Sequence, residues 1–431
     1  MGIVQKVMAD GVAEEKLLSQ LRERSEETDK KVTEAVRAII GEVRARGDAA
    51  LRDYAERFDG GSPERLEVTR EEMGDALTGA DQRLVQALLN AQEKIATFHQ
   101  RQKREAFVDM QPDGVVLGQR VRGLARVGLY VPGGTAAYPS TVLMNAIPAK
   151  IAGVEELVMV TPPVNGRANP DILLAAAIAG VDRVFLCGGA QAVAALCYGT
   201  ETIPRVDKIV GPGNIYVATA KKLLYGAVDI DMIAGPSEIL VMADRTANPR
   251  YVAADLLSQA EHDRLASAIL LTDDAALADA VIAELERQAA RLSRREIIEQ
   301  SLRDWGAVIV CRDKEQMVEL SNRVAPEHLE VCCENPMEYV GRLDNAGSVF
   351  LGNYAPEPLG DYYAGPNHVL PTSGTARFFS PLSVDSFVKR SSFIYYTREA
   401  LESARADVEL LARTEGLTAH AGAVSIRFEE E

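Results

Sequence analysis

The sequence has few cysteines for its length. Five cysteines occur in 431 residues, and no two of them form a C-x-x-C pair. An odd, sparse set of thiols in a long chain favours reduced cysteines over a disulfide framework. The first residues also lack the apolar run of a signal peptide, and no apolar stretch is long enough to span a bilayer. We therefore expect a cytoplasmic protein that does not enter membranes.

Positive charge is scarce relative to negative charge. The formal net charge is −16 at pH 7, and the sequence pI is about 5.0. A nucleic-acid-binding protein would show a basic face, and docking on anionic lipid would need a basic cluster. We expect a small-molecule ligand and neither nucleic acid nor membrane as partner. At about 150 residues per domain, the length suggests roughly three domains.

The middle of the chain has the sequence pattern of alternating strands and helices. From about residue 126, short β-branched runs alternate with Ala-rich helical patterns, which is typical of a mainly parallel sheet. IAGVEELVMV begins at Ile151 and IAGVDRVFLC at Ile178, so two consecutive units 27 residues apart are predicted to have one shape. After Gly235, the runs EILVMAD, SAILLTDD and GAVIVCR predict strands of a second α/β core.

The two ends of the chain are predicted to be helical. Apolar residues recur at helical spacing from Val32 to Val43, and residues 81–107 form a second long helical pattern, with His99 interpreted as a surface or packing histidine. Residues 397–413 are amphipathic and precede EGLTAHAGAVSIRF. This C-terminal part is too short for a third core and is interpreted as an appended tail.

Three glycine-containing segments form a candidate nucleotide site. They are YVPGG (130–134), GGAQ (188–191) and GPGN (211–214), and the last two directly follow predicted strands. Glycine lets the backbone approach a ligand closely, and a helix N-terminus offers free N–H groups to an anion. The G-x-G-x-x-G fingerprint is absent, so ordinary tight turns remain the alternative.

A candidate metal site begins in NPRYVAADLLSQAEHD. Asn248 and Pro249 predict a helix start, and Gln259 and His262, three residues apart, are expected on one helix face. Imidazole nitrogen and side-chain oxygen suit zinc. Further donors must come from elsewhere, and Asp361 and His420 are the best remaining ones. Taken singly, each of these residues could also be a surface or capping residue.

A candidate acid–base pair lies in APEHLE. Glu327 and His328 place a carboxylate beside an imidazole, which titrates near neutral pH and can carry protons both ways. Adjacent Glu and His also occur on ordinary surfaces. A thiol nucleophile at Cys332 or Cys333 is a rival, but LEVCCE resembles a strand end, where buried structural cysteine is the commoner outcome.

Taken together, these segments resemble one family. YVPGG, GGAQA, VGPGN, DMIAGPSEILV, LLSQAEHD, NRVAPEHLE, GDYYAGPNHVLPT, SFIYYT and EGLTAHA stand in the order expected of histidinol dehydrogenases. The resemblance covers roughly residue 30 to the end. It implies oxidation of L-histidinol through L-histidinaldehyde to L-histidine, the last step of histidine biosynthesis, with two NAD reduced.

The resemblance also implies the site residues. One zinc ion per subunit would hold the substrate, and His328 would act as general base while Glu327 activates the water that hydrates the aldehyde. The implied zinc ligands are Gln259, His262, Asp361 and His420. Ser237 and Glu415 would contact the substrate together with the zinc ligands and the catalytic pair. NAD would bind Tyr130, Gln191 and Asn214, and His368 would lie near the substrate.

The family fold is expected to consist of two incomplete Rossmann-like domains with parallel sheets. The expected divisions are a helical segment (1–29), a first α/β domain with the metal and catalytic residues (30–126 and 238–381), a second α/β domain for NAD (127–237) and a dimerisation tail (382–431). In the implied homodimer, the tail completes the partner's site, an exchange suited to two-fold symmetry.

Three other functions compete with this one. A zinc hydrolase would keep the metal residues without a nicotinamide site. A non-catalytic binding protein should lack one of the catalytic or metal residues, and this chain has all of them. A relative acting on another alcohol is the closest rival, although Ser237, Glu415 and His420 match histidinol.

Overall fold

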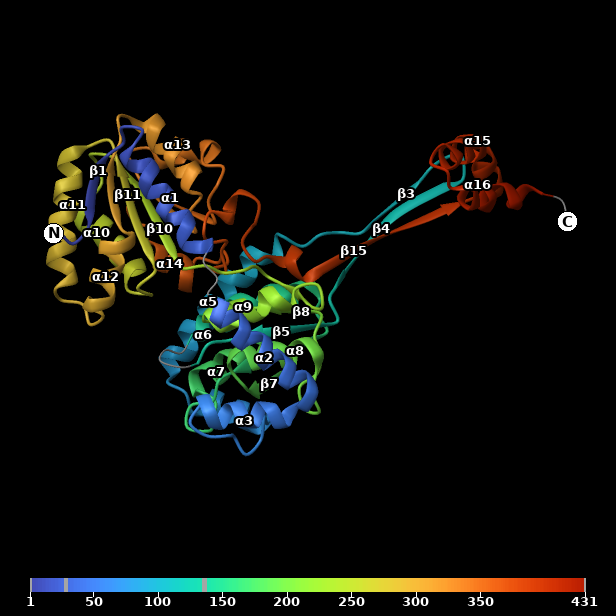
Figure 1. Ribbon diagram of the computed structural model, residues 1–431, viewed down its shortest axis with the longest axis horizontal. Coiled ribbons are helices and arrows are strands. Elements are labelled where there is room, and N and C mark those ends of the chain that lie inside the picture. The colour runs from blue at the N-terminus through green and yellow to red at the C-terminus, as the bar shows by residue number, and fades with distance from the viewer. Residues whose placement is uncertain (1, 27–29, 134–137, 430–431) are drawn as a thin grey trace.

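The computed structural model describes residues 2–26, 30–133 and 138–429. Two α/β bodies lie side by side, and an arm projects from them and ends in the last two long helices (Figure 1). The described residues form three sheets, two with six strands and one with three. The α/β class with parallel sheets is therefore confirmed.

The first six-stranded sheet is built from the predicted repeat. Its strands are β2 (Glu67–Val68), β5 (Arg126–Tyr130), β6 (Glu156–Thr161), β7 (Arg183–Leu186), β8 (Lys208–Val210) and β9 (Asp229–Ile230). The order is β2-β7-β6-β5-β8-β9, and every pair except β2–β7 is parallel. The two units of the repeat have the predicted shape. Gly153 and Gly180 each end a helix in the left-handed conformation, before β6 and β7 respectively.

Helices cover both faces of this sheet. They are α2 (Lys30–Arg46), α3 (Asp48–Phe58), α4 (Arg70–Gly79), α5 (Gln82–Gln100), α6 (Pro139–Ala152), α7 (Pro170–Ala179), α8 (Gly189–Tyr198) and α9 (Ile215–Leu224). The apolar faces of α2 and α3 pack with α8 and α9, and α4 and α5 pack with α6 and α7. The predicted grouping of residues 30–126 with 238–381 is therefore wrong, because the apolar stripe from Val32 to Val43 is buried against the other sheet.

The second six-stranded sheet is entirely parallel. Its strands are β1 (Gln5–Met8), β10 (Glu238–Ala243), β11 (Ser267–Thr272), β12 (Ala307–Val310), β13 (His328–Cys332) and β14 (Ser348–Leu351). The order is β1-β12-β11-β10-β13-β14. The predicted strands in EILVMAD, SAILLTDD and GAVIVCR are confirmed. The N-terminal segment is not purely helical, since β1 extends the edge of this sheet beside β12.

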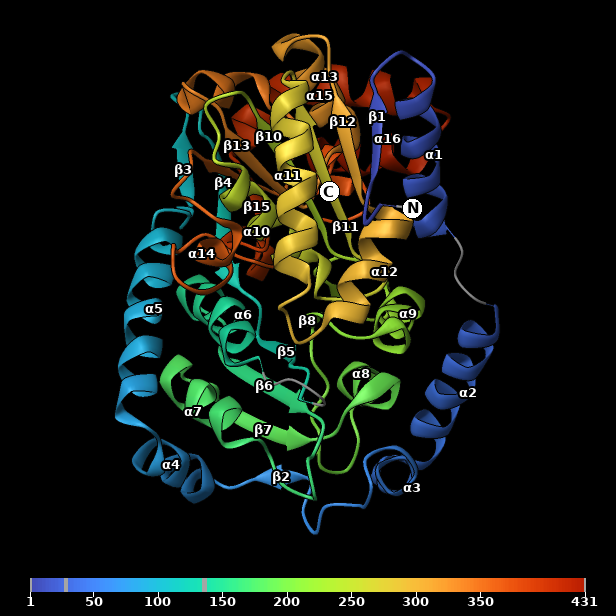
Figure 2. The same cartoon turned by 90° about the vertical axis from the view of Figure 1, so that its left-hand side faces the viewer.

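Helices also cover both faces of the second sheet (Figure 2). They are α1 (Ala13–Glu26), α10 (Pro249–Ala260), α11 (Ala275–Ala289), α12 (Arg295–Trp305), α13 (Lys314–Val324) and the short α14 (Glu357–Tyr362). The core on one face comes from α10, α11 and α12, and the core on the other from α1 and α13. Short 3-10 turns span Pro336–Arg342, Thr375–Arg377, Val384–Phe387 and Ile426–Phe428.

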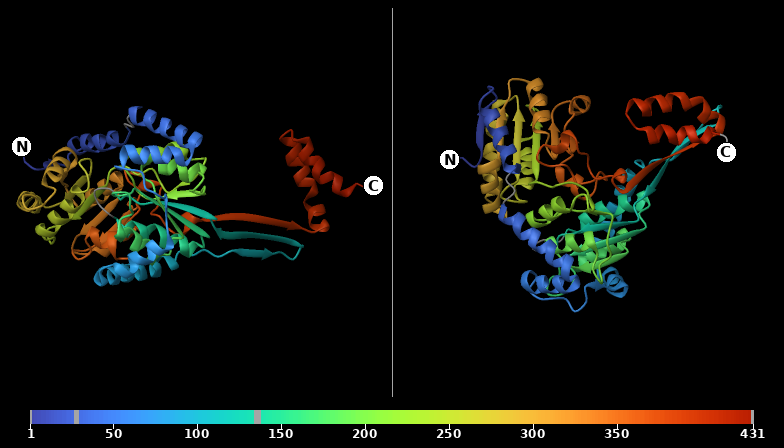
Figure 3. Two further views of the ribbon diagram at one scale, coloured as in Figure 1. Left: turned by 90° about the horizontal axis from the view of Figure 1, so that it is seen from below. Right: turned by 45° about the vertical axis from the view of Figure 1, so that its right-hand side comes forward.

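The arm is an antiparallel sheet that the sequence did not reveal. It contains β3 (Phe107–Met110), β4 (Val115–Gly123) and β15 (Val388–Tyr396), and it carries α15 (Arg398–Thr414) and α16 (Thr418–Ser425) at its end (Figures 1 and 3). The predicted tail of 382–431 therefore shares its sheet with residues 107–123. Its amphipathic helix begins as expected, with Thr397 as N-cap.

The arm exposes many large apolar side chains. They include Phe107, Val108, Met110, Ile394, Tyr395, Leu410, Leu411 and Ile426. Exposed apolar patches of this kind mark surfaces that bind another protein. Among the residues described, no helix combines the length and apolar character that a membrane crossing requires.

Each large sheet has one point at which the strand order reverses. In the first sheet this point lies between β5 and β8, and in the second it lies between β10 and β13. Ligands of open α/β sheets bind in the crevice that such a reversal leaves beyond the carboxyl ends of the strands. The glycine segments lie at these ends of the first sheet. In the second sheet the candidate catalytic residues lie at the opposite, amino ends of β10 and β13.

Candidate active site

Glu327 and His328 lie at the junction between the end of α13 and the start of β13. Ala325 ends α13 in the left-handed conformation, and His328 is the first residue of β13. Both side chains of the pair are buried. Glu327 Oε2 accepts the N–H of Glu238 at 2.9 Å and lies 3.7 Å from His328 Nδ1. The strand pairing of β10 with β13 thus holds the carboxylate and the imidazole together.

The contacts of His328 assign different roles to its two nitrogens. Nδ1 lies 3.1 Å from the carbonyl oxygen of Glu238, which can only accept, so Nδ1 carries a proton and donates it. In the neutral ring Nε2 is then the unprotonated nitrogen. Nε2 is buried and has no hydrogen-bond partner among the described residues. The ring is therefore oriented as a base that receives a proton at Nε2.

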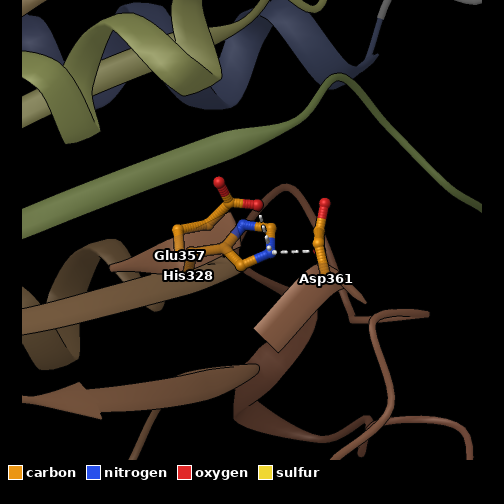
Figure 4. A group of neighbouring side chains, drawn as sticks. All are labelled: His328, Glu357 and Asp361. Carbon is orange, nitrogen blue, oxygen red and sulfur yellow. Dashed lines mark ion pairs between the residues drawn. The ribbon is translucent and has the colours of Figure 1, made fainter. Parts of the chain in front are cut away.

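Two carboxylates of α14 face His328 Nε2. Glu357 Oε1 and Asp361 Oδ1 each lie 3.8 Å from it, and Figure 4 shows both side chains pointing toward the ring. Their spacing of four residues places them on one face of the helix. A cavity of about 270 Å³ lies beside this group, with His328, Asp361 and His368 among its lining residues. Glu357 belongs to none of the sequence motifs, although its position four residues before Asp361 could have revealed it.

Electrostatics favour a charged imidazole in this cluster. Burial alone would lower the pKa of His328, but the carboxylates of Glu327, Asp361 and Glu357 raise it to about 10. Burial raises the pKa of Glu327 to about 7 against the lowering effect of His328. Both pKa values are raised, and strongly perturbed acid and base groups side by side are common at catalytic sites. Glu327 therefore titrates near physiological pH, whereas His328 keeps its proton until the pH is well above 7.

The structure brings three of the four predicted metal ligands to this region. Gln259 is 1% exposed, and its Oε1 has no hydrogen-bond partner within the described residues. Burial lowers the pKa of His262, while the charge of nearby Asp361 raises it. Nitrogen and oxygen donors in this combination suit zinc, and a buried amide oxygen without a partner fits a ligand role. The donor set therefore fits a metal ion.

Two details of the metal prediction need correction. The helix α10 starts as predicted, with Asn248 as N-cap, but it ends at Ala260, so His262 lies in the turn beyond it. Gln259 and His262 remain close because the N–H of His262 donates to the carbonyl of Gln259 at 3.1 Å. Among His, Cys, Asp and Glu of the described residues, the one group with metal-site geometry is His328, Glu357 and Asp361. It shares Asp361 with the predicted set.

The remaining predicted residues lie in two places. Ser237 directly precedes β10 and is half-buried, and His368 donates from Nδ1 to the carbonyl of Asp361 at 3.0 Å. His420 and Glu415 are exposed at the end of the arm, on α16 and just after α15 (Figure 1). Within one chain these two residues do not join the other site residues.

Tyr130, Gln191 and the Gly211–Asn214 loop meet at the carboxyl edge of the first sheet. The Tyr130 hydroxyl accepts the N–H of Gly189 at 3.0 Å, and Gln191 is buried. Asn214 caps α9, with its side-chain oxygen accepting from Tyr216 and Val217. The last residue of YVPGG, Gly134, lies outside the described residues. The loops after β5 and β8 flank the reversal point, and the loop after β7 joins them through the Tyr130 hydroxyl, at the edge where α/β sheets bind nucleotides.

The two crevices are neighbours. Thr141, near the start of α6, lies with its Oγ1 3.4 Å from His368 Nε2. The helix α6 follows the glycine loop after β5, whereas His368 accompanies Asp361. A ligand in the nucleotide crevice would therefore lie next to the histidine and carboxylate cluster.

The cysteines have structural positions. All five are free and buried. Burial raises the pKa of Cys333 to about 11 and that of Cys332 still further. A thiol of this kind stays protonated and is a poor nucleophile. The geometry thus favours the structural interpretation over a thiol mechanism.

Glu330 and Asp255 form a carboxyl pair next to Glu357. Glu330 is 2% exposed, and its Oε1 accepts the N–H of Glu357 at 2.7 Å. It also hydrogen-bonds to Asp255, which belongs to α10. Burial raises the pKa of Asp255 to about 6, and burial together with the Asp255 charge raises the pKa of Glu330. The pair therefore retains a proton that free carboxyls would lose.

This pair makes a prediction about stability and pH. Because both pKa values are raised on folding, the folded state binds more protons, and its stability falls as pH rises from about 4 through about 6. Glu330→Gln keeps an acceptor for Glu357 and removes one charge. Relative to the unaltered chain, we expect Glu330→Gln to raise the free energy of unfolding by about 1–2 kcal/mol more at pH 8 than at pH 5. Denaturant titrations at the two pH values measure this difference. The exposed Glu319→Gln is the control, and equal effects of Glu330→Gln at both pH values would contradict the account.

Comparison with known proteins agrees with this geometry. The family model "Histidinol dehydrogenase" matches residues 22–428. The histidinol dehydrogenases of Clostridium acetobutylicum and Listeria innocua are each 54% identical to this chain, and the matches cover 99% and 97% of this chain and 98% of each relative. The crystal structure of histidinol dehydrogenase from Elizabethkingia anophelis superposes with a TM-score of 0.93 at 38% identity, covering 99% of this chain and 98% of that one. The chain belongs to the histidinol dehydrogenase family.

Proposed function

We propose that this chain oxidises L-histidinol to L-histidine through the aldehyde, reducing two NAD. Each oxidation removes one hydride and one proton from carbon and oxygen, and one water enters when the aldehyde is hydrated. The observation that carries the proposal is His328 Nε2, a buried ring nitrogen without a hydrogen-bond partner in the described structure, beside two carboxylates. Family membership gives the oxidoreductase activity; the residue roles below are our inference.

Gln259, His262 and Asp361 would hold zinc, with His420 supplied by a second subunit. When bound, zinc would supply a cation that orients the substrate's nitrogens, and NAD would accept the hydride. The unpartnered Oε1 of Gln259 supports this assignment. Ser237 and Glu415 would contact the substrate, with Glu415 also coming from the second subunit.

His328 would take the hydroxyl proton in each oxidation. Its Nδ1–H is held by the carbonyl of Glu238, so the proton arrives at Nε2, the nitrogen facing Asp361 and Glu357. Glu327 would deprotonate the water that adds to the aldehyde. A carboxylate whose pKa is raised to about 7 can accept a proton from water and release it again near neutral pH.

Tyr130, Gln191 and Asn214 would contact NAD in the crevice between β5 and β8. The segments that lead into α8 and α9 lie at the carboxyl edge of the first sheet, where α/β proteins bind dinucleotides. Its closeness to His368, through Thr141, would bring a bound nicotinamide toward the substrate.

The exposed arm supports a homodimer. A monomer would leave the apolar side chains of β3, β15 and α15 in water. A second copy would cover them and could place α16 of one subunit at the site of the other, a reciprocal exchange that two-fold symmetry allows. We also place the enzyme in the cytoplasm, where its free thiols would stay reduced.

Glu327→Gln separates the two oxidations. The amide keeps an acceptor for the N–H of Glu238 but cannot take a proton from water. We expect oxidation of added histidinaldehyde to slow by about 10²-fold, a usual contribution of a positioned base, while alcohol oxidation slows less. Stopped-flow NADH formation from each substrate measures both steps. Equal slowing of both would remove the assigned role of Glu327.

A further inference from the structure

A buried ion pair lies under the nucleotide crevice. Lys221 belongs to α9, and Asp231 directly follows β9. Their side chains are 3% and 1% exposed, and Nζ contacts Oδ1 directly. Burying two charges is costly, and an apolar pair of similar volume would often stabilise a fold as well. The pair therefore needs an explanation beyond stability.

Both charges also bind one glycine of the crevice. Lys221 Nζ donates to the carbonyl of Gly211 at 3.0 Å, and the N–H of Gly211 donates to Asp231 Oδ2 at 2.8 Å. Asp231 Oδ1 further accepts the N–H of Met232 at 2.7 Å. The pair thus satisfies both backbone hydrogen-bonding groups of Gly211 and fixes the orientation of its two peptide bonds.

Gly211 occupies a position where its conformation matters. Its φ is +114°, and a Cβ there would lie 2.1 Å from the carbonyl oxygen of Tyr130. Only glycine allows the end of β8 to approach the end of β5 this closely. The contact lies at the reversal point of the sheet, where the loops after β5 and β8 would flank a bound dinucleotide.

The Lys221 side chain connects α9 back to the start of the Gly211–Asn214 loop. The loop leads into α9, which Asn214 caps, and about two turns further along α9 the Lys221 side chain returns to the carbonyl of Gly211. Asp231 also connects the segment after β9 to β8, because the N–H of Asp231 donates to the carbonyl of Ile209. Movement of the loop would have to break a buried, charged contact.

We propose that Lys221 and Asp231 are positioning residues for NAD. They hold the Gly211–Asn214 loop in the one shape that leaves the crevice open to the dinucleotide and presents the start of α9 to it. Neither side chain reaches the ligand; both act through Gly211. The inference deepens the proposed function and rests on NAD binding between β5 and β8.

The test uses the full-length, zinc-loaded protein and measures the dissociation constant of NAD by calorimetry. The double variant Lys221→Met with Asp231→Leu removes both charges, so that no unpaired charge stays buried. We expect NAD binding at least about tenfold weaker, with the KM for histidinol and the zinc content unchanged. The control is Lys208→Met with Asp229→Leu, an ion pair with its atoms 2.8 Å apart at the amino ends of β8 and β9, away from Gly211. Its removal should leave NAD binding unchanged.

Asp231→Asn provides a second, isosteric test. It retains an acceptor for the N–H of Gly211 and should weaken NAD binding, though less than the double variant does. If the double variant does not fold, Asp231→Asn carries the test alone. Unchanged NAD affinity in a folded double variant, or in Asp231→Asn when the double variant does not fold, would overturn the proposal. Lack of NAD binding by the unaltered chain would overturn it too. If the unaltered chain binds NAD but forms no NADH from histidinol, the proposed function fails, and the pair is still judged on the affinity ratios.

Discussion

Replacing His328 with asparagine is expected to lower kcat for NADH formation from histidinol by about 10³-fold, within the range for loss of a general base. The amide can still donate to the carbonyl of Glu238, as Nδ1 does at 3.1 Å. It has no basic group at the position of Nε2. The alcohol proton then has no basic nitrogen to accept it at the position that faces Glu357 and Asp361.

The pH profile distinguishes this role from a structural one. Carboxylates raise the pKa of His328 to about 10, so its basic form grows as pH rises from 7 to 9. We expect kcat of the unaltered chain to rise over this range and the residual activity of His328→Asn to lose that rise. Zinc content and thermal unfolding should stay the same in the variant. A variant that keeps both the rate and the pH dependence would show that another group takes the proton.

Mixing two inactive variants is expected to restore activity if subunits share sites. His420→Asn should lose zinc and activity, because three donors of one chain leave the ligand set incomplete. Asp361→Asn should do so as well, since this carboxylate lies 3.8 Å from His328 Nε2 and belongs to the predicted ligand set. A mixed dimer would contain one site with both native ligands and one with neither.

Random exchange of the two variants should recover about a quarter of the unaltered activity, because half of the dimers are mixed and each has one intact site of two. We expect the subunits to share sites because α16 carries His420, exposed, at the end of the arm (Figure 3). Subunit exchange would be verified with differently tagged chains. Mixed dimers without recovered activity would show that His420 serves its own chain or no metal at all.

Local signals in the sequence predicted much of the fold. The repeat beginning at Ile151 and Ile178 became β6 and β7 with their preceding helices, because each unit carries its own glycine stop and buried strand. The caps Asn248 and Thr397 start their helices as expected. Such features depend on neighbours in the chain, so they can be read without the tertiary structure.

Features that depend on distant partners were missed. The arm pairs β4 with β15, and Val115 faces Tyr396 across 281 residues of chain, so neither segment alone indicates an antiparallel sheet. The face on which α2 packs was assigned to the wrong sheet, since an apolar stripe does not specify its partner. Glu238 and Glu330 became visible as site residues only once β10 and β13 were paired.

The site itself was reached mainly through resemblance to a family. Periodicity and spacing suggested Glu327, His328 and Gln259 as candidates, but each also had an ordinary surface interpretation. The structure adds burial, the tautomer of His328 and the unpartnered Oε1 of Gln259. It also shows that His420 lies apart from the other donors within one chain, so a complete ligand set would require a second subunit.

The central claim is tested most directly by NADH formation from L-histidinol and NAD, before and after metal is removed with a chelator. We predict two NADH per histidine formed, loss of activity on chelation and recovery when zinc is returned. Absence of NADH from the zinc-loaded protein would contradict the substrate assignment. Activity that survives complete removal of metal would contradict the role given to Gln259, His262, Asp361 and His420.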